Sequence, residues 1–352
     1  FSSCRVNWNR GKQRVRLTFE LVIHDEFESR HDPSRDGTMV EQQSFKDSIK
    51  NFYYDSRIYL KYGTTSPEVI SLPFTNRSLS IDPDDPRARK KLIIKSGLRG
   101  RTSRNQLFWQ TAIQEFRPQT VLDIGFNYGE CMLSTTYEPG ARLFAFEANQ
   151  GLEPYIEQSL SKHPNQEQIE CHFKLVSDTI EETDFWVDKE WSGCSSAARP
   201  NVEQSPEKYE KKSVASVTID HVLKSSHCDQ EKLFFKLDVE GYEYRVLLGM
   251  QETIEQTQEI LGFVEFDPTL LRRAGENVHE YWDFLRNQFN VYAFEKDGDW
   301  RSYQHLDMLE LEFLCGDKFH TDLLLIKSDS SEEINVQLQS AWKQLSTRKF
   351  AA

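Results

Sequence analysis

The chain has 352 residues, 38% of them hydrophobic, which is enough to bury the core of one large domain plus an extension. Its formal net charge of −13 argues against nucleic acid as a partner, because surfaces that bind phosphate backbones are usually basic. No apolar run approaches the roughly 20 residues that a membrane-spanning helix needs, so no membrane partner is predicted.

The cysteines are widely scattered and include no Cys-x-x-Cys pair. This spacing favours free thiols in a reducing compartment over a disulfide framework or a zinc site. We therefore expect a cytoplasmic protein, whose oligomeric state the sequence does not predict.

Residues 1–104 are polar and are predicted to form an N-terminal α+β extension of unknown role. Apolar residues alternate along Arg57–Tyr62, as in a half-buried strand, and Val69–Leu72 is a second candidate strand. Asp82–Pro86 should break the chain as a turn. The basic stretch Arg87–Arg104 is interpreted as a solvated linker.

The stretch VLDIGFNYGE, Val121–Glu130, follows a helix predicted by apolar spacing over Arg104–Phe116. It predicts a buried strand, a glycine-containing turn and then a helix. In α/β folds such a turn holds a nucleotide-like ligand at the carboxyl edge of a parallel sheet. Gly125 and Gly129 would let the backbone turn sharply and come close to the ligand.

A second predicted strand, Leu143–Phe146, ends at Glu147, which lies 24 positions after Asp123. That separation suits one βαβ unit, in which the second acidic residue accepts hydrogen bonds from ribose hydroxyls. Helices and strands alternate beyond this point, which favours a parallel, doubly wound sheet. The expected elements are a helix over Pro154–Leu160, strands over His172–Val176 and Val214–Val217, and a helix over Ile219–Leu223.

The second stretch with chemical content is LFFKLDVEGYE, Leu233–Glu243. In an extended strand Lys236, Asp238 and Glu240 would share one face, because side chains alternate with period two. Three charges there must pair or bind something. We interpret them as a site; the alternative is a lysine–carboxylate pair at a strand end.

Several predicted strands end in carboxylates, and the carboxyl ends of parallel strands meet at one edge of a sheet, where the ligand crevice lies. The next strand, Ile260–Phe266, continues this pattern. The converging residues are Asp123, Glu147, Asp238 and Glu265. The tail is predicted as a helix over Val278–Phe289, strands over Val291–Phe294 and Asp322–Lys327, and a helix over Val336–Leu345.

The glycine turn favours S-adenosylmethionine over a nicotinamide cofactor. A dehydrogenase would normally show Gly-x-Gly-x-x-Gly for its pyrophosphate, whereas this turn has bulky residues between two glycines. It resembles motif I of the class I S-adenosylmethionine-dependent methyltransferases, whose ligand has no phosphate.

The order of VLDIGFNYGE, FAFEANQ, LVSD, a paired-serine loop, SVTIDHVL, FFKLDVEGYEYRVLLGM and FVEFDP resembles the FkbM family of methyltransferases. The most specific part is K-x-D-V-E-G-x-E followed by V-L-x-G, and the resemblance covers about Asn105–Lys327. It implies a doubly wound, mostly parallel Rossmann-like class I methyltransferase sheet, in a domain that we place at residues 105–352.

The resemblance also implies transfer of a methyl group from S-adenosylmethionine to a hydroxyl of a carbohydrate or related natural product, so that a small molecule or glycan is the acceptor. The loop with Ser195 and Ser196 would lie near that acceptor, together with Glu240. Carried over to this chain, the cofactor-binding residues would be Asp123, Gly125, Phe126, Asn127, Gly129, Glu147, Ala148, Asn149, Ser177 and Asp178.

Such a reaction needs an in-line hydroxyl and removal of its proton. A desolvated carboxylate base would serve, with Asp238 and Glu265 as candidates and Lys236 tuning them. A Mg²⁺ or Mn²⁺ ion on Asp238, Glu265 and Asp267 would serve equally, by analogy with other sugar O-methyltransferases. The alternatives for the whole chain are a non-catalytic cofactor-binding or scaffold protein with a methyltransferase fold, and a nicotinamide dehydrogenase.

Overall fold

The computed structural model describes residues 50–100, 102–200, 207–226, 231–295, 299–315 and 319–350. The chain divides into two compact units, residues 1–51 and 52–352, and every strand of the described chain belongs to the second unit. Residues 1–49 of the predicted extension lie outside the described residues.

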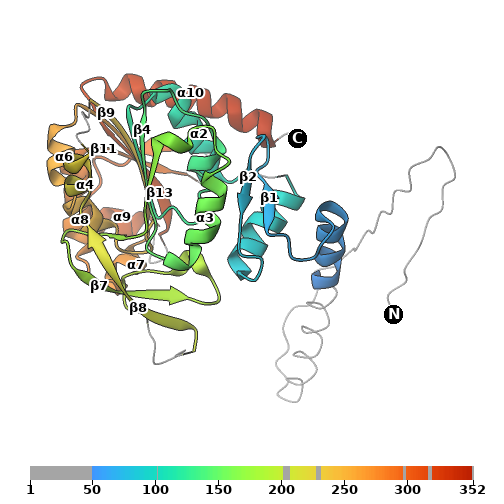
Figure 1. The fold of residues 1–352 in the computed structure, drawn as a ribbon. Coiled ribbons are helices and arrows are strands. Elements are labelled where there is room, and N and C mark those ends of the chain that lie inside the picture. Colours follow the sequence, from blue (N-terminus) through green and yellow to red (C-terminus); the bar gives the residue numbers. More distant parts are fainter. Residues whose placement is uncertain are drawn as a thin grey trace, which may run out of the picture. The chain divides into compact units, whose positions relative to one another are not determined.

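An eight-stranded sheet forms the centre of this unit, in the order β12-β11-β13-β10-β9-β3-β4-β5 (Figure 1). The five strands from β10 to β5 are parallel, and β13 runs antiparallel to both of its neighbours. This confirms the predicted mostly parallel, Rossmann-like sheet. The strands are β3 (Thr120–Ile124), β4 (Arg142–Phe146), β5 (Ile169–His172), β9 (Lys232–Leu237), β10 (Glu259–Phe266), β11 (Asn290–Phe294), β12 (Trp300–Ser302) and β13 (Thr321–Lys327).

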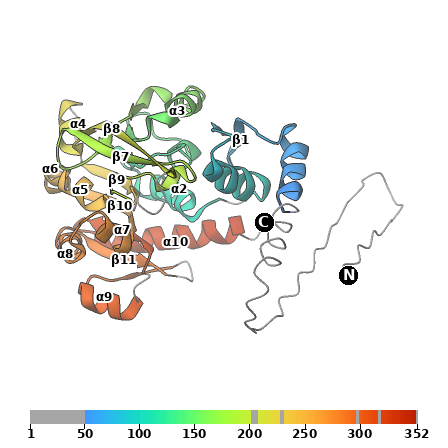
Figure 2. The same ribbon diagram turned by 90° about the horizontal axis from the view of Figure 1, so that it is seen from below.

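Helices cover both faces of the sheet (Figures 1 and 2). One face packs α2 (Arg104–Phe116), α3 (Glu153–Leu160) and α10 (Ser331–Phe350), and its core includes Val121 and Phe234. The neighbouring residues Leu122 and Phe235 point into the core on the other face, as period-two alternation requires. The helices of that face are α4 (Ile219–Ser225), α5 (Glu243–Leu248), α6 (Gln251–Gln256), α7 (Pro268–Arg273), α8 (Val278–Gln288) and α9 (Met308–Cys315).

Two smaller sheets complete the described fold. In the first, β8 (Tyr209–Val217) pairs parallel with β6 (Leu175–Val176) and antiparallel with β7 (Glu182–Asp188). The second is an antiparallel pair, β1 (Val69–Ser71) and β2 (Ser78–Ser80). The predicted strand His172–Val176 is therefore divided between β5 and β6. In the described residues no helix has the length and apolar content needed to cross a bilayer.

The strand predicted over Arg57–Tyr62 is wrong, because these residues are helical. Ile58 is fully buried while Leu60 is 84% exposed, although alternation would place both on one face. Tyr54, Ile58 and Tyr62 instead repeat every four residues and bury one side of the helix.

The helix predicted after the glycine turn is also wrong, since only the 3₁₀ turn η3 (Met132–Ser134) forms there. Ser134 Oγ donates to the Cys131 carbonyl at 2.7 Å, which competes with helix formation. Thr135 is then fully extended, with φ −134° and ψ 176°.

The basic stretch is not a solvated linker. Residues Ala88–Leu98 form the π-helix η2, which buries Leu92 and Ile93 in the core. Its Lys91 and Lys95 line a cavity that also includes the ends of the parallel strands.

Candidate functional site

A cavity of about 590 Å³ lies at the carboxyl edge of the parallel strands. The strand order reverses between β3 and β9, which is where ligands bind in doubly wound sheets. The ends of β3, β4, β9 and β10 line the cavity together with η2 and the loop around Trp191. The predicted position of the crevice is therefore confirmed.

Gly125 lets the chain at the end of β3 come close to the end of β9. It has a φ of 82°, and a Cβ atom there would lie 1.9 Å from the Asp238 carbonyl oxygen. Gly129 has a φ of 80°, and a Cβ there would meet the ring of Phe126 at 2.5 Å. The bulky Phe126 thus packs beneath the turn, where it is 2% exposed.

Asp123 and Lys236 are buried against each other, with Lys236 Nζ 3.7 Å from Asp123 Oδ1. Among the described residues neither Asp123 oxygen has a hydrogen-bond partner of ordinary length and geometry. Burial raises the pKa of Asp123 to about 7, although Lys236 acts to lower it. Burial would lower the pKa of Lys236, but Asp238 at 3.3 Å and Asp123 raise it, so the ammonium stays charged.

Glu147 ties the glycine turn to the end of β4. Its two carboxylate oxygens accept backbone N–H groups of Asn127 and Asn149, each at 2.7 Å. Burial raises the pKa of Glu147, and these two N–H groups and Arg87 act to lower it. Asn127 Oδ1 in turn accepts a hydrogen bond from Arg87 at 2.8 Å.

Some of the predicted cofactor residues line the cavity and others do not. Asp123, Gly125, Phe126, Asn127, Glu147 and Ala148 lie in its wall, whereas Gly129, Asn149, Ser177 and Asp178 do not. The Asn149 side chain caps Gly151 N at 3.2 Å, and Asp178 pairs with Arg245 at 2.9 Å. Leu175 and Val176 line the wall, whereas Ser177 and Asp178, which follow them in the chain, do not.

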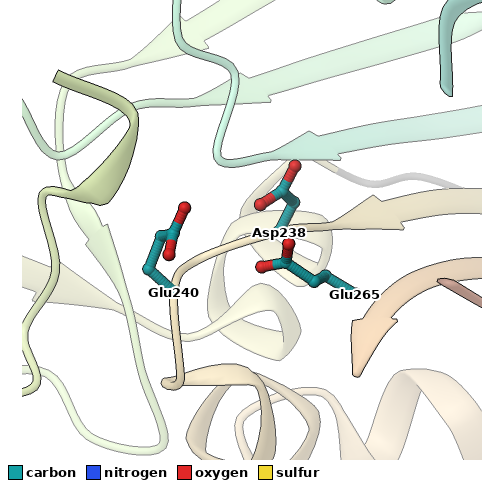
Figure 3. Close-up of side chains that lie close together, drawn as sticks. All are labelled: Asp238, Glu240 and Glu265. Carbon is teal, nitrogen blue, oxygen red and sulfur yellow. The ribbon is translucent and has the colours of Figure 1, made fainter. Parts of the chain in front are cut away.

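Three carboxylates gather at the ends of β9 and β10 (Figure 3): oxygens of Asp238, Glu240 and Glu265 lie within 4.8 Å of one another. Burial would raise the pKa of Asp238, but Lys236 holds it below its ordinary value. Burial and the charge of Asp238 raise the pKa of Glu240 to about 8 and that of Glu265 to about 11. The cluster thus retains protons at neutral pH unless a cation binds, and its oxygens suit a hard divalent ion.

Glu240 reaches the cluster from a turn, so the prediction of one extended strand face is wrong for this residue. β9 ends at Leu237, and Glu240 has a φ of 57°. Glu243 accepts the N–H groups of Val239 and Gly241, each at 3.1 Å, and Ser196 Oγ donates to the Glu240 carbonyl at 3.0 Å. Such a backbone persists only where its surroundings fix it, and it is common at active sites.

The paired serines have different positions. Ser195 lines the cavity, and its Oγ accepts from Asp188 N at 3.1 Å. The Ser196 side chain is outside the lining and holds the turn that carries Glu240.

Asp267 lies outside the three-carboxylate cluster. Its Oδ1 caps α7 by accepting from Thr269 N at 2.8 Å, and its Oδ2 is 3.3 Å from His320 Nδ1. Glu240 occupies the place in the cluster that the sequence assigned to Asp267.

Sequence reasoning missed several cavity residues. Arg87 pairs with Glu130 at 2.7 Å, and Arg104 pairs with Asp322. Asp322 and Glu265 are paired in register. Because β13 is antiparallel, its first residues reach the edge where the parallel strands end; the polar His320-Thr321-Asp322 before an apolar strand was the available signal.

The family model of the methyltransferase FkbM domain matches residues 123–318 of this chain. The chain is 12% identical to the solved methyltransferase FkbM from Methylobacillus flagellatus KT, with a TM-score of 0.37, covering 80% of this chain and 60% of that one. It is 8% identical to the O-methyltransferase TomG from Streptomyces achromogenes, solved with SAM, with a TM-score of 0.36, covering 71% of this chain and 92% of that one. No curated protein sequence matches the chain.

Proposed function

This chain belongs to the FkbM family of methyltransferases, and from that premise we propose that it is an S-adenosylmethionine-dependent O-methyltransferase. Its acceptor would be a hydroxyl group of a carbohydrate or related natural product. When bound, the cofactor supplies a methyl group that its sulfonium makes electrophilic.

The observation that carries the proposal is the carboxylate wall at the ends of β3 and β4. Asp123 is 1% exposed, lines the cavity and has no hydrogen bond of ordinary length and geometry in the described structure, which suits the cofactor's ammonium group. Glu147 accepts one N–H at each oxygen and has lone pairs left for two ribose hydroxyls. A cation with hydroxyls fits this wall better than a dinucleotide with a pyrophosphate.

The cluster of Asp238, Glu240 and Glu265 would take the acceptor's proton. Lys236 keeps Asp238 ionised and fixed, and Glu240, with a pKa of about 8, is near the range in which a base works at neutral pH. Mg²⁺ or Mn²⁺ on the same oxygens would lower the pKa of the acceptor hydroxyl. Removal of divalent ions by a chelator separates the carboxylate-base route from the metal route.

Calorimetric titration with S-adenosylmethionine and its demethylated product tests the proposal. We expect one bound cofactor per chain, and absence of binding would refute the proposed function. Transfer of a radiolabelled methyl group is then measured on a panel of glycans and hydroxylated metabolites. Cofactor binding without transfer to any member would favour the non-catalytic binding protein instead.

A further inference from the structure

One wall of the cavity carries cations and hydrogen-bond donors, and two of these cations have no carboxylate partner among the described residues. Four basic residues at or beside η2 repeat every four positions, which places them along one side of a helix. All four line the cavity: Arg87, Lys91, Lys95 and Arg99. π-Helical segments are rare, and single π-turns within helices are frequent at functional sites.

Some of the cations that line the cavity are paired with carboxylates, and others are not. Arg87 is neutralised by Glu130, and Lys236 lies between Asp123 and Asp238. In the described part of the chain, no carboxylate is within 4.0 Å of the ammonium groups of Lys91 and Lys95. Given a net charge of −13, two cations without a carboxylate partner on one cavity wall need an explanation.

Lys91 is held in place without being neutralised. Its ammonium lies 5.8 Å from the centre of the Trp191 ring, within the range of a cation–π contact. Burial lowers the pKa of Lys91, and the neighbouring Lys95 and Arg87 lower it further. An anion between these groups would remove that repulsion.

Buried donors on the same wall provide an independent observation. Gln106 is 2%, Thr102 7% and Ser96 8% exposed, and all three line the cavity. Gln106 Nε2, Thr102 Oγ1 and Ser96 Oγ have no hydrogen-bond partner within the described ranges. Buried polar atoms are nearly always paired, and an amide nitrogen can only donate. The Gln106 amide nitrogen therefore lacks an acceptor, and the two hydroxyls lack any hydrogen-bond partner in the described structure.

We propose that this wall binds an anionic group of the methyl acceptor, a sulfate ester, a phosphate ester or a carboxylate, so that the substrate is an acidic saccharide. The inference rests on the proposed function. The cofactor's single carboxylate offers about four acceptor sites, fewer than the two ammonium groups and three buried polar groups of this wall can engage. The term "oxyanion wall" denotes Lys91, Lys95, Ser96, Thr102 and Gln106.

The first experiment measures anion binding directly. The full chain, saturated with the demethylated cofactor, is titrated by calorimetry with inorganic sulfate, inorganic phosphate and glucuronate at constant ionic strength. We expect saturable binding of at least one probe, and the preferred probe separates tetrahedral esters from a carboxylate. Lys91→Gln/Lys95→Gln should raise its Kd at least tenfold.

The matched control is Lys211→Gln/Lys212→Gln on β8, which changes the net charge equally at residues outside the cavity lining. It should change the Kd less than twofold. Equal weakening in both double variants, or no saturable anion binding to the wild type, overturns the inference. So does a loss of cofactor affinity in the Lys91/Lys95 variant, which would assign the wall to the cofactor.

The second experiment uses matched acceptors: a neutral sugar, its 6-sulfate, its 6-phosphate and the corresponding uronic acid. We expect the wild type to methylate a charged member best and the Lys91/Lys95 variant to raise its KM at least tenfold with kcat nearly unchanged. Methylation of the neutral sugar alone, equally by both proteins, would refute the oxyanion wall and leave the proposed function intact. Failure of the wild type to bind cofactor would refute the function itself.

Discussion

At the scale of single residues, cofactor binding and chemistry should depend on different side chains of the cavity. Glu147→Ala removes the carboxylate that ties the glycine turn to β4, so we expect at least tenfold weaker cofactor binding by calorimetry. Asp238→Asn should leave that affinity within about threefold and lower kcat at least a hundredfold, a typical loss for a proton-transfer group. Normal turnover in Asp238→Asn, with both variants folded, would show that the assignment is wrong.

Asp123 should give the apo-protein a measurable pH dependence. Its pKa is raised from 3.8 to about 7 by burial, so the folded state binds its proton more tightly than the unfolded state does. The stabilisation is therefore complete below about pH 4 and lost as the pH rises to about 7, with a slope of at most about 1.4 kcal/mol per pH unit.

Thermal unfolding of Asp123→Asn between pH 5 and 8 checks this prediction. The variant cannot ionise at this position, so its Tm relative to the wild type should rise with pH across the window. A constant difference would mean that Asp123 keeps an ordinary pKa.

The carboxylate cluster makes metal dependence testable. If a divalent ion occupies Asp238, Glu240 and Glu265, chelation should abolish methyl transfer, and added Mg²⁺ or Mn²⁺ should restore it. Activity that survives prolonged chelation and dialysis would leave the carboxylate base as the route. Glu240→Gln then becomes the decisive variant, with an expected loss of kcat and unchanged cofactor affinity.

At the scale of elements, the sequence predicted a helix or strand correctly where its apolar residues fitted only one repeat. The helix predicted over Arg104–Phe116 forms at those bounds and is capped by Ser103 Oγ. Its apolar spacing fits a helical repeat and no other. Ile58 and Tyr62 fit both a four-residue and a two-residue repeat, and burial on the helix decided between them. The short apolar run Cys131–Leu133 gave no hint that Ser134 would bind the preceding backbone.

The sequence likewise predicted only those site residues whose position follows from a local pattern. Asp238 and Glu265 follow apolar strands and could be placed at one edge of a sheet. Asp322 could not, because its position depends on the direction of β13, which is a long-range property. The residues of the oxyanion wall precede the glycine turn in the chain, and their place in the cavity depends on how η2 and α2 pack, which no local pattern predicts.

The connection after α3 supports a second pH prediction. His163 Nε2 donates to the Thr135 carbonyl at 2.9 Å while Nδ1 accepts from Asn165 N at 3.2 Å, so the ring is neutral. Burial lowers its pKa to about 4. In the unfolded state the histidine has its ordinary pKa of about 6.5, so the unfolded state binds a proton that the folded state does not. The unfolding free energy should therefore fall as the pH drops from about 6.5 to about 4.

Chemical denaturation at pH 7 and pH 5 measures this effect. We expect His163→Gln to reduce the difference in unfolding free energy between the two pH values and the exposed His279→Gln to leave it unchanged. The same slope in all three proteins would locate the pH sensitivity elsewhere.

At the scale of the whole molecule, cofactor binding should stabilise the fold. The cofactor would contact ends of β3 and β4 at the centre of the sheet, so only the folded state binds it. At 100 times its Kd, the demethylated cofactor should add about 2.7 kcal/mol to the unfolding free energy. Scanning calorimetry would detect this as a higher Tm, whereas reduced nicotinamide dinucleotide should produce no shift.

The single turn at Met132–Ser134 bears on this choice of cofactor. A helix several turns long sums its peptide dipoles into about half a positive charge at its N-terminus, which attracts phosphate. Residues 125–141, all of them described, contain no α-helix and so build no such macrodipole beside the cavity. Without that dipole the turn offers little to a pyrophosphate, whereas Asp123 and Glu147 in the same wall suit a ligand with an ammonium group and hydroxyls.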